Sequence, residues 1–133
     1  MSARPFEHLV ILVVDDSPIY GELLGRQIEH LGGTALVAIS IIDAKLVLAK
    51  RMPHAALVDL VLLDDGNGLD LIRDLRGLYP HLPCILHTSF EPPAGFEDVP
   101  YLPKPCEVED LVAVVLDVIG TKSTNPPPPE ETT

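Results

Sequence analysis

The sequence is poor in aromatic residues and rich in aliphatic ones. It contains no tryptophan, and aromatic residues make up 5% of its 133 residues, whereas 47% are hydrophobic. This balance indicates a core of Leu, Val and Ile side chains, which suits a parallel sheet covered by helices. The length corresponds to one domain with a sizeable core and leaves no room for two.

Positive charge is also scarce. Nine residues are Lys or Arg and twenty are Asp or Glu, which gives a formal net charge of −11. Such a chain repels phosphate backbones. We therefore expect no nucleic-acid partner.

Cysteine and long hydrophobic runs are scarce too. Cys84 and Cys106 have no metal-type spacing, which favours a reduced, cytoplasmic setting. The apolar run at residues 9–14 is too short for a signal peptide and leads directly into two aspartates. No segment approaches the roughly 18 apolar residues of a membrane span, so we expect no membrane association.

Each short apolar run in the chain is followed by a polar residue capable of chemistry. The runs at residues 9–14, 55–58, 84–87 and 99–102 lead to Asp15 with Asp16, to Asp59, to Thr88 and to Lys104. In open parallel sheets, functional groups collect outside the carboxyl ends of the strands. We therefore expect these carboxylates, the hydroxyl and the ammonium to converge.

Helical patterns alternate with the strand candidates. Apolar stripes predict helices over residues 18–31, 41–51, 68–78 and 108–119, with Ser17 and Ser40 as N-caps and Gly120 as the end of the last helix. A further strand is expected at residues 34–39. This alternation predicts an α/β fold with a doubly wound, five-stranded parallel sheet.

Proline and glycine interrupt the pattern in two places. Pro92, Pro93, Gly95 and Pro100 leave no room for a full helix over residues 90–100, so a loop or a single turn is expected. We predict a short leader at residues 1–7, a folded domain at 8–120 and a disordered, proline-rich acidic tail at 121–133.

The last predicted helix is apolar nearly all round between residues 111 and 116. Such a helix is usually covered on all sides, which would fit a homodimer formed through it. A few exposed Val and Ala side chains are also normal in a monomer. The sequence supports both interpretations equally.

The expected cluster of carboxylates has a specific chemical use. Neighbouring carboxylates repel one another, and Mg²⁺ with oxygen ligands relieves that repulsion. Phosphoryl transfer needs a nucleophile held in line and positive charge or donors for the phosphoryl oxygens. Asp59 would attack, while Mg²⁺, Lys104 and Thr88 would each serve one oxygen. The product would be an aspartyl phosphate.

Four motifs in a fixed order carry a family resemblance. They are Val13-Val14-Asp15-Asp16-Ser17, Leu57-Val58-Asp59-Leu60, Leu86-His87-Thr88-Ser89 and Tyr101-Leu102-Pro103-Lys104-Pro105. Over residues 9–120 the chain resembles the receiver domain of two-component response regulators. The resemblance implies a flavodoxin-like fold with strand order 2-1-3-4-5. It also implies phosphorylation of Asp59 by a histidine kinase or a phosphotransfer protein.

The resemblance assigns roles to individual residues. The metal would be held by Asp15, Asp16, Asp59 and the backbone carbonyl of Val61. Asp59, Lys104 and Thr88 would be the catalytic residues, Thr88 and Tyr101 the switch pair, and Lys104-Pro105 a cis peptide. Val61 and Phe90 occupy positions that tune the lifetime of the phosphoryl group. The kinase would dock on the exposed start of the first helix, at Ile19, Tyr20 and Leu23.

The chain also departs from the family pattern. Leu63 stands where the family usually has proline, and one extra residue is expected around Asp64 and Asp65. The shortened fourth helix resembles that of single-domain receivers of alphaproteobacteria, which act in phosphorelays.

Two other functions compete with a phosphorylation switch. A phosphatase with an Asp nucleophile needs an acid–base Asp two residues further on, where Val61 stands. A receiver-like docking module that ignores phosphate has no physical need for clustered carboxylates. We therefore expect a switch that catalyses only its own phosphorylation and dephosphorylation.

Overall fold

The computed structural model describes residues 4–62 and 66–124. Its main sheet has five parallel strands in the order β2-β1-β3-β6-β7. These strands are β1 (Val10–Val14), β2 (Thr34–Ala38), β3 (Ala55–Val58), β6 (Cys84–Thr88) and β7 (Tyr101–Pro103). Counted along the chain, this is the predicted order 2-1-3-4-5, and the predicted fold class is confirmed.

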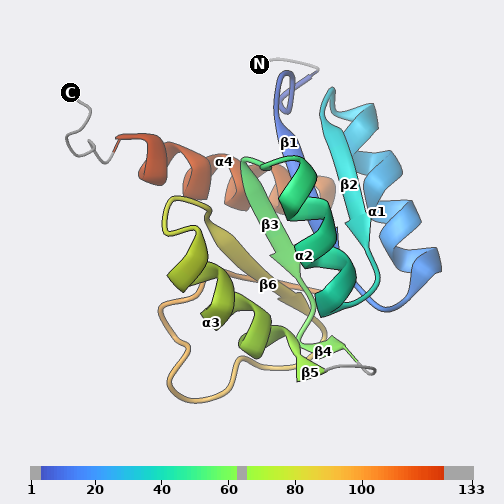
Figure 1. Ribbon diagram of the computed structural model, residues 1–133. Coiled ribbons are helices and arrows are strands. Elements are labelled where there is room, and N and C mark those ends of the chain that lie inside the picture. Colours follow the sequence, from blue (N-terminus) through green and yellow to red (C-terminus); the bar gives the residue numbers. More distant parts are fainter. Residues whose placement is uncertain (1–3, 63–65, 125–133) are drawn as a thin grey trace.

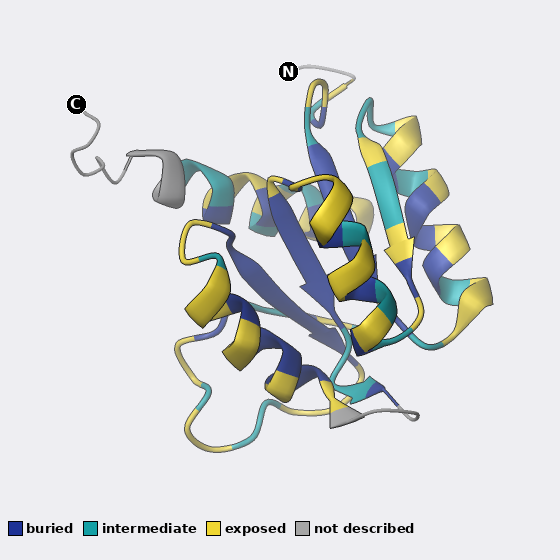
Figure 2. Ribbon diagram, in the orientation of Figure 1, coloured by how far each residue is buried: buried dark blue, intermediate teal, exposed yellow. Residues whose placement is uncertain are grey.

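Helices cover both faces of the sheet (Figure 1). They are α1 (Pro18–His30), α2 (Ile41–Lys50), α3 (Gly68–Leu78) and α4 (Val108–Thr124). The sheet separates two apolar clusters, one packed against α2 and α3 and the other against α1 and α4. Successive strand residues point to opposite faces, so a strand buried on both faces is continuously apolar, as β1 is. Figure 2 shows the buried central strands beneath helices whose outer faces are exposed.

The helix starts follow from local capping chemistry. The Ser17 side chain accepts a hydrogen bond from the Tyr20 N–H, and Pro18 occupies the first turn of α1, as predicted. Ser40 accepts from the Asp43 N–H at the start of α2. Asn67, which the sequence analysis did not single out, caps α3 by accepting from two backbone N–H groups.

The C-terminal boundary of the last helix was predicted wrongly. Helix α4 continues through Gly120 to Thr124 and so includes the first four residues of the predicted tail. A glycine in a helix interior costs only about 1 kcal/mol relative to alanine. The next residue that stops a helix outright is Pro126, which lies outside the described residues.

The N-terminal boundary also differs from the prediction. Phe6 falls in the predicted leader, yet its side chain is fully buried in the cluster under α1 and α4. Its backbone N–H donates to the Leu31 carbonyl at 3.0 Å. A single aromatic residue in a polar stretch gives no periodic signal, so this anchor was missed.

The segment between β6 and β7 is irregular, as predicted. Residues 89–100, all of which the structure describes, contain turns and bends and form no helix. The strand after it is Tyr101–Pro103, two residues later than the expected start at residue 99.

Within the described ranges, no helix is both long enough and apolar enough to span a bilayer.

The loop after β3 contains a feature that the sequence did not predict. Val61–Leu62 (β4) pairs antiparallel with Gly66–Asn67 (β5). The departures noted at Leu63, Asp64 and Asp65 lie outside the described residues. Gly68 closes this loop against the sheet, because a Cβ there would lie 1.9 Å from the carbonyl oxygen of Asp59.

Candidate functional site

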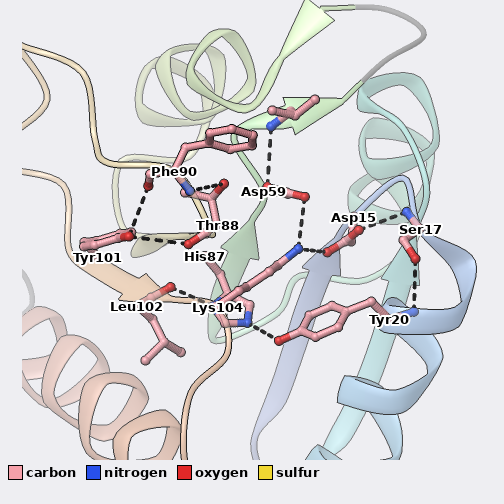
Figure 3. A network of polar contacts seen from close by, with 11 residues as sticks. Asp15, Ser17, Tyr20, Asp59, His87, Thr88, Phe90, Tyr101, Leu102 and Lys104 are labelled. Carbon is pink, nitrogen blue, oxygen red and sulfur yellow. Dashed lines mark hydrogen bonds and ion pairs between the residues drawn. The ribbon is translucent and has the colours of Figure 1, made fainter.

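The site lies at the carboxyl ends of four strands (Figure 3). Asp15 and Asp16 follow β1, Asp59 follows β3, Thr88 is the last residue of β6, and Lys104 follows β7. Asp15 and Thr88 are buried, while Asp16, Asp59 and Lys104 are half-buried. The parallel topology alone brings these residues to one edge.

The predicted convergence of the three carboxylates is confirmed. Oxygen atoms of Asp15, Asp16 and Asp59, one from each residue, all lie within 4.8 Å of one another. The Asp15 Oδ1 atom also accepts a hydrogen bond from the Ser17 N–H at 2.9 Å, which fixes this carboxylate at the start of α1. Such a set of oxygen ligands fits a hard divalent cation such as Mg²⁺.

Lys104 links two of these carboxylates. Its Nζ donates to Asp15 Oδ2 and, at 3.0 Å, to Asp59 Oδ2. Only 16% of the Lys104 side chain is exposed, so this ion pair is poorly screened by water. Three carboxylates against one ammonium leave an excess of negative charge. That excess attracts a cation rather than an anion.

Asp59 is the first residue of the loop after β3. Its backbone N–H donates to the Val14 carbonyl at 2.9 Å, which ties the start of this loop to β1. The Val61 N–H approaches Asp59 Oδ1 at 3.4 Å. Val61 therefore lies beside the proposed acceptor, and its role as a backbone metal ligand remains a prediction.

Thr88 and Tyr101 are joined through the backbone. The Thr88 Oγ1 atom accepts a long hydrogen bond from the Phe90 N–H at 3.4 Å. The Tyr101 hydroxyl donates to the Phe90 carbonyl at 3.1 Å and approaches the Thr88 carbonyl at 3.5 Å. Both predicted switch residues therefore contact the backbone of the segment from Thr88 to Phe90. The Lys104-Pro105 peptide bond is cis, as predicted.

The docking prediction needs one correction. Ile19 and Leu23 are exposed, at 82% and 58%, and lie one helical turn apart on the outer face of α1. Tyr20 is half-buried instead, and its ring lies against Lys104 with the centroid 4.3 Å from Nζ. Helical geometry explains the difference, because Tyr20 shares its side of α1 with the buried Leu24.

The sequence analysis gave His87 no role and missed the contacts that it makes beside the site. His87 Nδ1 lies 2.7 Å from the Leu102 carbonyl, and Nε2 lies 2.7 Å from the Tyr20 hydroxyl. Burial lowers the pKa of His87; the Leu102 hydrogen bond opposes this effect, and the charge of Lys104 reinforces it. The available signal was a polar residue inside an otherwise apolar buried strand, since such residues need partners.

Comparison with known proteins agrees with this geometry. The sequence matches the response regulator receiver domain over residues 11–116. The photosynthetic apparatus regulatory protein RegA of Rhodovulum sulfidophilum is 32% identical over 128 residues, covering 90% of this chain and 67% of RegA. The response regulator MprA of Mycobacterium tuberculosis is 33% identical over 111 residues, covering 77% and 47%.

A solved CheY-like receiver domain from Methanospirillum hungatei has the same fold. It superposes with a TM-score of 0.78 at 19% identity, over 89% of this chain and 97% of that one. The fold and the site together define the class of this protein, an open parallel α/β domain with an acidic cluster at the carboxyl edge of its sheet. The chain belongs to the response regulator receiver domain family of two-component signal transduction. It spans about two thirds of RegA and about half of MprA.

Proposed function

We propose that this receiver accepts a phosphoryl group on Asp59 from a phosphohistidine of a histidine kinase or phosphotransfer protein. The observation that carries the proposal is the cluster of Asp15, Asp16 and Asp59, with Lys104 bonded to two of the three. An ammonium and two further carboxylates around one nucleophile fit phosphoryl transfer, since a structural role does not require them.

The chemistry is a single displacement. A carboxylate oxygen of Asp59 attacks phosphorus, the P–N bond to the donor imidazole breaks, and the imidazole leaves with the bonding electrons and takes up a proton. The Lys104 ammonium neutralises one phosphoryl oxygen, and the Thr88 hydroxyl donates to another. Asp15, Asp16, Asp59 and the Val61 carbonyl would hold Mg²⁺, which when bound neutralises charge on the transferring group. The product is an acyl phosphate.

The output is a change in protein contacts. Phosphorylation draws Thr88 toward the phosphoryl group and so disturbs the hydrogen bonds that link Thr88, Phe90 and Tyr101. The surface around Tyr101 then favours a second arrangement that a partner recognises. Ile19 and Leu23, both exposed on α1, are the proposed docking residues for the phosphodonor.

Two apolar residues are proposed to set the lifetime of the phosphoryl group. Val61 lies beside Asp59, and Phe90 follows Thr88 by two residues and is 55% exposed. We propose that both side chains hinder the approach of water. Replacing both with small polar residues should accelerate loss of phosphate, and an unchanged decay rate would contradict this role.

Three finer statements belong to the same proposal. The receiver acts as a single-domain regulator in a phosphorelay, it catalyses no reaction beyond its own phosphorylation and dephosphorylation, and it forms a homodimer through α4. The irregular segment before β7 supports the first, because the shortened fourth helix is the feature in which the chain resembles single-domain receivers. Leu116, 40% exposed on α4, supports the third. The mass of the protein isolated from its source tests the first statement, and the sedimentation of Leu116→Lys tests the third.

Intact mass after incubation with acetyl phosphate tests the central proposal. A single phosphoryl adduct should form only with Mg²⁺ and should be absent in Asp59→Asn. A folded protein that forms no adduct would favour the phosphate-independent docking module. Continuous release of phosphate from a phosphorylated substrate would favour the phosphatase.

A further inference from the structure

Tyr20 connects Lys104 to a buried hydrogen-bond chain (Figure 3). Its ring faces the Lys104 ammonium at 4.3 Å, and its hydroxyl reaches His87 Nε2 at 2.7 Å. The other nitrogen of His87 lies 2.7 Å from the carbonyl of Leu102, two residues before Lys104. The chain of contacts thus runs from β7 through β6 to α1 and back to Lys104.

The direction of each hydrogen bond follows from the chemistry of the groups. A carbonyl oxygen can only accept, so His87 Nδ1 carries the proton and donates to Leu102. The neutral ring then has an acceptor at Nε2, and the Tyr20 hydroxyl donates to it. Burial, with the nearby Cys106, Asp15 and Asp59, raises the pKa of Tyr20 to about 12 and keeps its hydroxyl protonated.

The contact with the Tyr20 ring matters because the Lys104 side chain is flexible. A lysine side chain loses considerable rotamer freedom when it is held in one place. The face of an aromatic ring attracts an ammonium without accepting any particular N–H bond. Tyr20 therefore holds Lys104 in place while leaving its N–H groups for carboxylate or phosphoryl oxygens.

We propose that Tyr20, held by His87, is a positioning residue for Lys104 in phosphoryl transfer to Asp59. This inference rests on the proposed function, in which the Lys104 ammonium neutralises a phosphoryl oxygen. The Tyr20 ring fixes the position of Lys104 Nζ relative to α1, and the hydrogen bond to His87 fixes the orientation of the ring. Tyr20 itself touches no reacting atom.

Two variants of Tyr20 separate the contributions of ring and hydroxyl. Tyr20→Leu removes both, whereas Tyr20→Phe keeps the ring face and loses the bond to His87. Tyr79→Leu is the matched control, since Tyr79 is another half-buried tyrosine and precedes β6 at the opposite end of the sheet. Amide spectra show which variants are folded.

The first readout is independent of phosphorylation. An ammonium over a ring face places the Lys104 Cε protons in the shielding region of the ring. In the unphosphorylated protein their signals should be shifted upfield in wild type, Tyr20→Phe and Tyr79→Leu, and should return to ordinary values in Tyr20→Leu. Ordinary values in wild type would overturn the proposal.

The second readout is the rate of phosphorylation at saturating acetyl phosphate and Mg²⁺. Tyr20→Leu should be slowed about tenfold, in line with the strength of a partly desolvated cation–π contact. Tyr20→Phe should be slowed about threefold or less, and Tyr79→Leu should match wild type. The half-saturating concentration of acetyl phosphate should stay constant, because positioning of Lys104 affects the transfer step.

The two readouts together distinguish this inference from the proposed function. A wild-type rate in folded Tyr20→Leu would overturn the positioning role, even though Asp59 phosphorylation would stand. If wild type forms no adduct, the proposed function fails, and the positioning role fails with it whatever the ring-current shift shows. If Tyr20→Leu does not fold, His87→Gln replaces it. Like Tyr20→Phe, this variant loses the bond between residues 20 and 87 and keeps the ring, so the upfield shift should persist and the rate should fall about threefold. An unchanged rate in folded His87→Gln would overturn the positioning role of this pair.

Discussion

His87 is a buried imidazole with a hydrogen-bond partner at each ring nitrogen. Burial lowers its pKa in the folded state, whereas in the unfolded chain it titrates near 6.5. Below that pH the unfolded state binds a proton that the folded state does not. Folding therefore loses stability as the pH falls, by up to about 1.4 kcal/mol per pH unit until the folded pKa is reached.

Urea unfolding of wild type and His87→Gln at several pH values measures this effect. The free energy of unfolding should fall more steeply below about pH 6.5 in wild type than in the variant. The other four histidines are common to both proteins and cancel in the difference. Parallel curves would mean that His87 titrates normally in the folded state.

Lys104 has opposite effects on metal binding and on phosphoryl transfer. Its ammonium bonds Asp15 and Asp59 and would compete with a cation for them, whereas the proposed mechanism uses it to neutralise the phosphoryl group. Lys104→Met should therefore bind Mg²⁺ at least as tightly as wild type and be phosphorylated about 100-fold more slowly or worse. Calorimetric titration and the rate of adduct formation measure the two effects.

The exposed Lys50 at the end of α2 provides the control for this experiment. Lys50→Met should leave both the affinity and the rate unchanged. Weaker Mg²⁺ binding in Lys104→Met would show that the lysine organises the carboxylates instead of competing for them.

At the scale of elements, the junction between the loop after β3 and helix α3 holds Asp59, the proposed acceptor, in place. Gly68 begins α3 directly against the Asp59 backbone, and its N–H donates to the Leu60 carbonyl at 2.8 Å. Gly68→Ala should lower the free energy of unfolding by about 1–3 kcal/mol and slow phosphorylation, because the backbone of Asp59 must move.

Gly77 in the same helix is the matched control, since a Cβ there meets no atom within 4 Å. Gly77→Ala should raise stability by about 0.5–1 kcal/mol through helix propensity and leave the phosphorylation rate unchanged. Denaturant unfolding and adduct formation measure both variants. Equal behaviour of the two alanine variants would contradict the role given to Gly68.

The elements that could be predicted are those with a strong local pattern. Helix α3 begins and ends at the predicted residues, because Leu69, Ile72 and Leu75 mark one buried face and Tyr79-Pro80 stops it. The end of α4, the β4-β5 pair and the burial of Phe6 were missed. Each depends on competition between weak local preferences or on packing against distant residues, and neither appears in a periodic pattern.

The same distinction applies to the site. The carboxylates and Lys104 could be predicted because parallel topology delivers the residue after each strand to one edge. The inward turn of Tyr20 and its bond to His87 depend on which side chains of α1 meet β6 and β7. That contact joins residues 67 positions apart in sequence, and no local spacing encodes it.

At the scale of the whole molecule, metal binding should stabilise the fold. The proposed ligands Asp15, Asp16 and Asp59 follow two separate strands, β1 and β3, so a cation that binds all three would favour the folded state. At a concentration about 100 times Kd the gain is about 2.7 kcal/mol. The melting temperature should rise with Mg²⁺ in wild type and in Glu29→Gln, which removes an exposed carboxylate on α1, and much less in Asp15→Asn. An equal rise in all three proteins would indicate general charge screening.

The most direct test of the account is the position of the phosphoryl group after reaction with acetyl phosphate and Mg²⁺. Hydroxylamine attacks the carbonyl carbon of an acyl phosphate, releases phosphate and leaves a hydroxamate that peptide mass spectrometry can place. We predict a single hydroxamate at Asp59 and none in protein treated without Mg²⁺. A hydroxamate at another carboxylate, or a phosphoryl group that resists hydroxylamine, would contradict Asp59 as the acceptor.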